Sequence, residues 1–591
     1  MFEHILMGLE HVFSLENLGL VLAGTVAGMV VGSLPGLTAT MAVALLVPFT
    51  YTMSPVAGLV TLGAIYMGCI YGGCFSAILI NTPGTPSSIG TTFDGYPMAR
   101  SGRGEEAIIG ATLGSAFGGL VGVIALIFLS PLLADVALKF GPPEYFWVGM
   151  FGLTIISSLA AGSFLKGITG AAFGVLISTI GIAPIGGDVR FTFGEPSLQG
   201  GFDLIVMLIG LFCIPELLTL SLQGAQNRQA VEYRRTKGVL RETTLKVLSK
   251  PGNLIRSAII GTVVGILPGA GGNIANLVSY NEARRASKEP EKFGTGIVDG
   301  VVATETANNA VVGGGMIPLF TLGIPGAPPD AVIYGVLLLQ GLRPGPELFS
   351  QRADITYTFM LALGLASIVM VPVGIYGGRL LTRIVATLPI KYLVPGIGIL
   401  TIVGSYAIRN NYTDVLLMLI FGVIGLGLRY LGFHGAPIVL RDRLGSILML
   451  AFVASLWVQR NYITPFGGIF PDIVMVCLAL LAVLTLVLSF TPWRAIKEEE
   501  PKKEKGEKKN WMDMIVVVII LLAWTGLLRY LGFALCGVAG FGGISWYLSE
   551  RRASPRTIMT CFVIGLAITY LLIYVFEHLL LVPLPVGTLF E

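Results

Sequence analysis

Residues 28–36 read Gly28-Met-Val-Val-Gly32-Ser-Leu-Pro-Gly36, and the pattern Gly-x-x-x-Gly-x-Leu-Pro-Gly returns at residues 261–269. The two copies are offset by 233 residues (261 − 28). A second shared motif, Pro-Gly-x-Pro, follows each copy, at residues 83–86 and 325–328. Proline removes a backbone donor and glycine permits unusual conformations, so each motif predicts a helix break inside an apolar segment. Paired interrupted segments in two halves of a chain point to the binding site of a secondary transporter.

The composition places the whole chain in a membrane. Of the 591 residues, 54% are apolar and only 12% are charged, whereas soluble domains carry about 25% charged residues. The deficit extends along the full length, which predicts an all-α polytopic membrane protein in contact with the lipid bilayer. The net charge of +4 is too small to indicate a nucleic-acid partner.

The residue types that carry enzymatic and metal chemistry lack the necessary spacing. The six cysteines form no CxxC pair, and the four histidines show no metal-ligand spacing. HExxH, GxSxG and the nucleotide-binding P-loop are all absent from the sequence. We therefore expect no enzymatic activity, no metal and no cofactor.

The distribution of Lys and Arg predicts the topology. Arg100 is the first basic residue of the chain, whereas residues 224–256 and 282–292 are rich in Lys and Arg. Basic loops lie in the cytoplasm, which puts the N-terminus outside. The segment 257–281 between two basic loops should then enter and return as a re-entrant hairpin broken at Pro268; a single tilted span is the rival interpretation. Residues 17–50 form either one long span and a stub or a helical hairpin. If the halves are inverted repeats, this first hairpin enters from the opposite side.

The chain divides into four parts. Residues 1–222 form the first repeat, 223–256 a basic cytoplasmic linker, and 257–440 the second repeat. Residues 441–591 lack the Pro-Gly motifs and form a C-terminal helical domain. Within that domain the highly charged tract 494–511 is predicted to be a cytoplasmic linker.

Several motifs resemble a known family. Gly-Ser-Leu-Pro-Gly-Leu-Thr at 32–38, Asn-Thr-Pro-Gly-Thr-Pro at 81–86 and Ala-Thr-Glu-Thr-Ala-Asn-Asn-Ala at 303–310 are similar to the large membrane subunit of the tripartite tricarboxylate transporters. Residues 441–591 resemble that family's small membrane subunit, with Phe470-Pro471 before a span among the signs. The usual large subunit continues past residue 440, so this departure suggests a fusion of the two subunits.

The resemblance implies a function. It implies uptake of di- or tricarboxylates, or related organic anions, through the cell inner membrane by a multi-pass protein. It also implies a soluble extracytoplasmic solute-binding protein as partner, and symport with Na⁺ or H⁺. The sequence leaves open which carboxylate is carried, which ion drives it and the oligomeric state, with a homo-oligomer among the alternatives.

The helix breaks supply the candidate substrate site. Half-helix N-termini present free N–H groups and a partial charge of about +0.5, which suits an anion without a fixed cation. Either break alone is ordinary packing and kinking of a membrane helix, but the duplicated motif in polar surroundings favours a site. The loop after residue 80 can likewise be an ordinary connection or a pocket lining. The predicted substrate-binding residues are Pro35, Gly36, Leu37, Thr38, Thr40, Asn81, Thr82, Pro83, Gly84, Thr85, Pro268, Gly269, Ala270, Gly271, Gly272, Asn273, Pro325 and Gly326.

One acid stands between apolar stretches. The burial of Glu305 must be offset by partners or by protonation, so it is a candidate for coupling a cation together with Asn308 and Asn309. The alternative for Glu305 is a helix cap or an interhelical hydrogen bond. Asp94 and Asp330 are less specific, and neither is assigned as an ion ligand.

Two functions from different classes remain. The first is a carboxylate transporter with its site at the two Pro-Gly breaks. The second is a channel or membrane assembly scaffold in which the repeats serve packing only. The run Gly24-x-x-x-Gly28-x-x-x-Gly32 is predicted to serve packing in either case.

Overall fold

The structure is a computed structural model that describes residues 2–159, 164–184, 186–222, 237–431, 439–460, 465–488, 511–549 and 552–590. The charged tract 494–511 lies outside the described residues except for its last member. The helices of the first half are α1 (Phe2–Val12), α2 (Leu15–Ser33), α3 (Ala39–Thr50), α4 (Pro55–Ile80), η1 (Pro86–Ser88), α5 (Thr91–Arg100), α6 (Gly104–Ala137), α7 (Pro142–Leu159), α8 (Phe164–Ser178), η2 (Pro196–Leu198), α9 (Leu204–Leu208), η3 (Ile209–Cys213) and α10 (Ile214–Leu222).

The second half of the chain continues in the same way. Its helices are α11 (Val239–Leu248), α12 (Pro251–Ile266), α13 (Gly271–Ala286), η4 (Pro290–Lys292), α14 (Val298–Leu322), α15 (Pro328–Leu339), α16 (Glu347–Ser350), α17 (Ala353–Thr387), α18 (Ile390–Arg409), α19 (Tyr412–Tyr430), α20 (Val439–Trp457), α21 (Pro465–Leu488), α22 (Trp511–Tyr547), α23 (Pro555–Ile573) and η6 (Tyr574–Leu579). A two-residue antiparallel pair, β1 (Gly181–Ile182) and β2 (Val189–Arg190), is the sheet found among the described residues.

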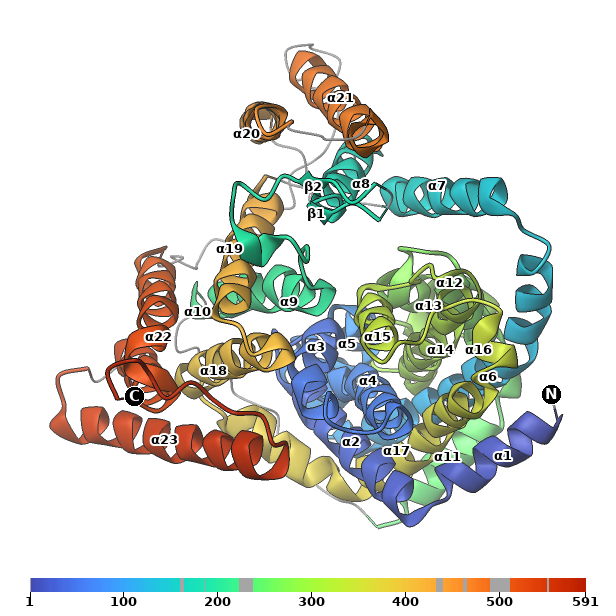
Figure 1. Ribbon diagram of the computed structural model, residues 1–591. Helices are drawn as coiled ribbons and strands as arrows, with labels where there is room; N and C mark the ends of the chain where they lie inside the picture. The colour runs from blue at the N-terminus through green and yellow to red at the C-terminus, as the bar shows by residue number, and fades with distance from the viewer. Residues whose placement is uncertain are drawn as a thin grey trace.

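Ten of the described helices are long and apolar enough to cross a membrane. The prediction of an all-α polytopic membrane protein is therefore confirmed. Two helices form the core. Helix α14 is buried along nearly its whole length, and 94% of the residues in the apolar stretch of α4 are buried. In Figure 1 these two helices lie within the group formed by α2, α6, α12 and α17.

The first Pro-Gly break makes a helical hairpin. The backbone of α2 approaches α4 at Gly24, where a Cβ atom would lie 2.8 Å from the Thr61 carbonyl oxygen, and again at Gly32, which abuts Cys69. Residue numbers rise together along both helices, so α2 and α4 run parallel. Because α4 starts beside the start of α2, the chain must return through α3 after the break. The predicted hairpin is confirmed.

The second break has the same consequence. Gly261 lies against Ala307, and a Cβ atom at Gly265 would lie 2.7 Å from the Val311 carbonyl oxygen. Thus α12 and α14 run parallel, and the chain returns through α13 before α14 begins. The hairpin interpretation is correct and the single tilted span is wrong, because α12 ends at Ile266 and α13 starts only at Gly271. The first helix of this hairpin begins at Pro251, six residues before the predicted repeat boundary.

The two repeats run in opposite directions. The long helices α6 and α17 meet where Gly119 lies against Ser367 and Gly364 against Val123, so numbers rise along one helix while they fall along the other. Each long helix also runs parallel to the core helix of the other repeat. The contacts are Gly114 with Val302, Gly122 with Ala310, Gly63 with Phe359 and Gly374 with Tyr71. Helix α14 is therefore antiparallel to α4, as inverted repeats require.

The C-terminal part lies beside the repeats and outside their core (Figure 1). Helices α20 and α21 pack on each other and on α8, while α23 packs on α22 and α22 packs on α18. Gly532 bends α22 with a φ of +73°, and the chain end fits into that bend: Phe533 N donates to the Pro585 carbonyl at 2.7 Å. The edge-to-face pair Phe49 and Phe576 (ring centroids 5.1 Å apart) connects this part to α3.

Candidate functional site

The first hairpin tip (residues 34–38) is a short non-helical turn. Gly36 has a φ of +89°, which side chains other than glycine rarely adopt, and Pro35 beside it is buried. Thr38 begins α3 as its N-cap: its hydroxyl oxygen accepts the Met41 N–H at 3.2 Å. The hydroxyl proton of Thr38 remains able to donate to a ligand.

The second hairpin tip (residues 267–273, which includes the first turn of α13) is more open. Gly269 has a φ of +83° and Gly271 a φ of +58°. The N-cap of α13 is Ala270, and no side chain caps the helix. The first N–H groups of α13 are thus left for solvent or a ligand. The side chain of Asn273, in this first turn, is exposed.

Each Pro-Gly-x-Pro loop touches the tip of its own repeat. In the first loop (residues 81–90) a Cβ atom at Gly84 would clash with the Gly32 carbonyl oxygen. In the second loop (residues 323–327) a Cβ atom at Gly326 would lie 2.6 Å from the equivalent carbonyl oxygen, that of Gly265. Gly269 N also donates to the Gly326 carbonyl at 2.8 Å. Only glycine permits these approaches, which explains why both loops contain it.

The first loop also reaches the other repeat. A Cβ atom at Gly272 would lie 2.7 Å from Ser87 Cβ and 2.9 Å from Asn308 Oδ1. Gly90 N donates to Asn276 Oδ1 of α13 at 2.9 Å. A continuous series of contacts therefore joins the end of α2, the first loop and the N-terminus of α13.

Both tips lie halfway along the core. The first tip follows Gly32, which abuts Cys69 in the middle of α4, and the second follows Gly265, which abuts Val311 in the middle of α14. The core helices meet where Asn309 Nδ2 donates to the Met67 carbonyl at 3.3 Å. The separation of 242 residues between Asn309 and Met67 equals that between the loop glycines (326 − 84). The pseudo-two-fold axis relating the repeats thus passes beside this pair.

The predicted substrate-binding residues differ in accessibility. Asn81 ends α4 in the left-handed conformation, and the Thr82 hydroxyl donates to the Ile80 carbonyl at 3.3 Å, so both have local roles in the turn. Buried residues are Pro35, Leu37, Thr40, Gly84, Thr85, Pro268, Ala270 and Gly326; partly exposed ones are Gly36, Thr38, Pro83, Gly271, Gly272 and Pro325; exposed ones are Asn81, Thr82, Gly269 and Asn273.

Glu305 is fully buried in a hydroxyl cluster. Thr91 of α5 donates a short hydrogen bond to Oε1, and Ser115 of α6 donates to Oε2 at 3.2 Å. Thr304, next in the chain, lies 3.1 Å from the Thr91 hydroxyl. No Lys or Arg bonds Glu305 among the described residues. The acid therefore sits between helices of both repeats, held by neutral donors alone.

Two asparagines extend this cluster toward the core crossing. Asn308 Nδ2 donates to the Ile70 carbonyl at 3.4 Å, and Asn309 donates as described to Met67. Their Oδ1 atoms are buried and accept no hydrogen bond in the described structure. Asn308 also contacts Glu305 and Gly272, so it links the acid to the second tip.

Comparison with known families decides what kind of protein this is. The sequence model of the tripartite tricarboxylate transporter TctA family matches residues 18–440, about seven-tenths of the chain. The chain belongs to the TctA family. The model of the TctB family follows at residues 441–585, so the large and small membrane components are fused in one chain, as the sequence suggests.

Two relatives come from Agrobacterium vitis. An uncharacterized 52.8 kDa protein in the TAR-I ttuC' 3' region is 37% identical over 76% of this chain and 88% of its own length. An uncharacterized protein in the TAR-II ttuC' 3' region is 33% identical over 35% of this chain and 85% of its own length. No solved structure matches the chain. Membership of the TctA family indicates a multi-pass membrane component of a tricarboxylate transporter and a transport role.

Sequence reasoning missed several contacts of the TctA part. Asp94 is fully buried: its Oδ1 accepts N–H bonds from Gly294, Gly296 and Ile297 at 2.8–3.0 Å, and its Oδ2 accepts the Tyr280 hydroxyl at 2.9 Å. This acid fastens α5 to the segment that leads into α14. Ser87 and Asn276, which join the halves, were also missed. Their partners lie about 190 residues away, which no local pattern indicates.

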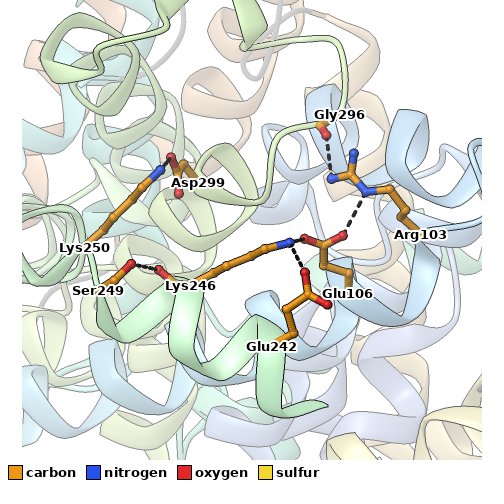
Figure 2. Close-up of polar contacts among 8 residues, drawn as sticks. All are labelled: Arg103, Glu106, Glu242, Lys246, Ser249, Lys250, Gly296 and Asp299. Atoms are coloured by element: carbon orange, nitrogen blue, oxygen red, sulfur yellow. Dashed lines mark hydrogen bonds and ion pairs between the residues drawn. The ribbon is translucent and has the colours of Figure 1, made fainter. Parts of the chain in front are cut away.

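An ionic network closes the end of the TctA bundle where α6, α12 and α14 begin (Figure 2). Lys246 of α11 pairs with Glu242 at 2.9 Å and with Glu106 of α6 at 3.2 Å. Lys250 pairs with Asp299 of α14 at 2.5 Å. Arg103 completes the network by contacting Glu106 at 2.8 Å and the Gly296 carbonyl at 3.0 Å. The network thereby joins α11 to α6 and the start of α12 to α14.

The pairing also affects proton binding. Lys246 donates hydrogen bonds to the carboxylates of Glu242 and Glu106, and these bonds raise its pKa. Its stabilising contribution is present below the pKa of an unfolded lysine, about 10.4, and is lost as pH rises through the raised value. Lys246 therefore keeps its charge throughout the physiological pH range.

We expect Asp299→Asn to weaken slightly the contact between the start of α12 and α14. Lys250 is half exposed, so the pair contributes less than about 1 kcal/mol, and the melting temperature in detergent should fall by a few degrees at most, less at high salt. Glu282→Gln, which removes a partly exposed ion pair with Arg285 within α13, is the matched control and should change nothing. Equal melting curves for both variants would contradict a fastening role.

Proposed function

We propose that this chain is the membrane part of a secondary active transporter for di- or tricarboxylates or related organic anions. It receives them from a soluble extracytoplasmic solute-binding protein and couples their uptake to a cation gradient across the inner membrane. The observation that carries the proposal is the position of the two hairpin tips. They approach from opposite ends of the bundle and stop halfway along α4 and α14. That arrangement suits alternating access around a central site.

The chemistry of the tips suits an anion. Residues 34–38, 81–90, 267–273 and 323–328 contain no Lys or Arg. N–H groups in the first turns of α3 and α13, together with Thr38 and Asn273, would donate to the carboxylates. Each charge-assisted hydrogen bond is worth about 1.5–3 kcal/mol. Dipolar donors bind a carboxylate without leaving a buried cation behind when the substrate departs.

Coupling is assigned to Glu305 with Asn308 and Asn309. A Na⁺ ion would take oxygen ligands from the acid and the two free amide oxygens, whereas a proton would neutralise the acid directly. Because Asn308 touches both Glu305 and Gly272 at the second tip, a change of charge at the acid is transmitted to the anion site.

The orientation follows from the basic residues. The end where α6, α12 and α14 begin carries the Lys and Arg residues of 237–256 and 284–292. We place that end in the cytoplasm, which puts the open side of the first hairpin and both chain termini outside.

A channel or assembly scaffold is the second candidate. It is favoured by the tight glycine packing of α2 on α4, where Gly24, Gly28 and Gly32 all abut backbone atoms. Counterflow in proteoliposomes discriminates between the two. A transporter exchanges labelled for unlabelled carboxylate with saturation, whereas a channel shows no saturable exchange and a scaffold shows no flux.

Removing one donor from each tip should weaken substrate binding. We expect Thr38→Ala and Asn273→Ala each to raise the half-saturating carboxylate concentration in counterflow about tenfold, for about 1.4 kcal/mol lost. Gly24→Ala is the packing control: its Cβ atom would lie 2.8 Å from the Thr61 carbonyl oxygen, so stability should fall with affinity unchanged. If Thr38→Ala and Asn273→Ala instead lower expression and leave substrate affinity unchanged, the tips serve packing and do not bind substrate.

A further inference from the structure

Asp330 is a buried acid that takes no part in the coupling proposed above. It lies in the first turn of α15, directly after the second Pro-Gly-x-Pro loop, and is fully buried. Its Oδ2 accepts the Ala327 N–H at 2.7 Å. Its Oδ1 is buried and accepts no hydrogen bond. The Tyr66 hydroxyl of α4 interacts with the same carboxyl group, so the acid faces the other repeat.

Glycines make room for this carboxyl group. A Cβ atom at Gly315 would clash with Oδ2, and one at Gly326 would lie 3.2 Å from it. The acid is thus held against the backbone of α14 and of the loop, next to the point where Gly326 accepts the Gly269 N–H. A change at Asp330 therefore acts directly on the second tip.

No basic group neutralises Asp330 within the described contacts. The elements packed against α15 are α3, α4, α9 and α14. Helices α3 and α9 contain no titratable residue, and α14 contributes Asp299 and Glu305, which bond to Lys250 and to Thr91. On α4 the titratable group facing Asp330 is Tyr66, with Cys69 beside it. An unpaired carboxylate buried this way is costly, so it requires a proton or a metal cation.

The symmetry of the repeats relates this acid to the first coupling site. At the offset of 242 residues Tyr66 corresponds to Asn308 (308 − 66), and Ser88 corresponds to Asp330 (330 − 88). Thus Tyr66 faces the second loop from the position on α4 that Asn308 occupies on α14. The two acids, Glu305 and Asp330, stand on either side of the axis beside Met67.

We infer that Asp330 and Tyr66 form a second monovalent-cation site, so that one transport cycle carries two cations, one bound beside each Pro-Gly-x-Pro loop. The inference rests on the proposed transport function. The sequence alone does not single out Asp330, and we did not assign it as an ion ligand on that basis. Its capping bond to Ala327 is real but uses only one carboxyl oxygen, which leaves the other for a cation.

The test compares accumulation with exchange for Asp330→Asn in proteoliposomes. The neutral amide keeps an acceptor for Ala327 N–H and mimics the cation-loaded acid, so counterflow of labelled carboxylate should continue. Accumulation driven by a potential of about 100 mV should fall about fifty-fold, the effect of losing one translocated charge. A Na⁺ gradient at equal pH and a pH gradient without Na⁺ are applied in separate experiments. They show which cation drives accumulation in the wild type and whether Asp330→Asn no longer responds to that cation.

Control variants distinguish failure of the second cation site from failure of the proposed transport function. Asp203→Asn removes the charge from a comparable capping acid at the start of α9 and should leave the ratio of accumulation to exchange unchanged. Tyr66→Phe should raise the half-activating cation concentration severalfold while exchange persists. Two results would overturn the second site. One is unchanged accumulation in Asp330→Asn. The other is loss of exchange in Asp330→Asn together with normal cation activation in Tyr66→Phe. Absence of counterflow in the wild type would instead refute the transport function itself.

Discussion

Replacing Gly269 with Val should lower carboxylate uptake more than about a hundred-fold while the protein still inserts into the membrane. Gly269 has a φ of +83°, where a β-branched residue is strained, and its N–H holds the second tip against Gly326. A distorted tip would misalign the N–H groups of α13. A hundred-fold loss corresponds to about 2.7 kcal/mol, which is within reach of two lost charge-assisted hydrogen bonds.

Gly36→Val tests the same argument on the other repeat. Its φ is +89°, and a Cβ atom there would clash with Leu220. Gly102→Val is the matched control, because Gly102 has a φ of +80° with open space around it and lies far along the chain from both tips. All three variants carry backbone strain, so all should lose some stability. Uptake that falls equally in Gly102→Val would show that strain, and not the site, causes the loss.

Glu305→Gln should abolish coupling. The amide removes the titratable charge and places an N–H₂ group against the hydroxyl donors Thr91 and Ser115. Accumulation driven by a potential of about 100 mV should drop at least about fifty-fold, while counterflow exchange continues at a reduced rate. Accumulation and exchange are measured in the same proteoliposomes, so their ratio does not depend on the amount of inserted protein.

Thr91→Val serves as the companion to Glu305→Gln. It removes one donor to the acid and leaves the charge in place, so the cation dependence should shift while accumulation is retained. If Glu305→Gln accumulates substrate as well as the wild type does, the acid is an interhelical hydrogen-bonding group, and coupling must be assigned elsewhere.

The local breaks in this fold could be predicted from sequence because their causes are local. Pro35 and Gly36 stop one helix, and Pro268 and Gly269 stop another, whatever surrounds them. The hairpin of 257–281 followed from the basic loops on either side of it. Duplication of the motif then predicted that the other hairpin is built alike.

The contacts that assemble the site could not be predicted in the same way. Ser87 meets Gly272 and Asn276 meets Gly90 only because inverted repeats bring α13 against the first loop. The chain segments involved are about 190 residues apart. Asp94 in particular reads as an ordinary acid of a polar loop, yet it binds three backbone N–H groups of the segment before α14.

The central claim is that the two tips form one substrate site reached from opposite faces. Its most direct test uses single cysteines, Thr38→Cys and Asn273→Cys, in a chain whose six native cysteines are replaced. A membrane-impermeant thiol reagent is applied from the outer face to the first and from the inner face to the second, over a range of carboxylate concentrations. The account predicts that substrate protects both positions with the same half-protecting concentration. Protection of one position alone, or two clearly different concentrations, would contradict it.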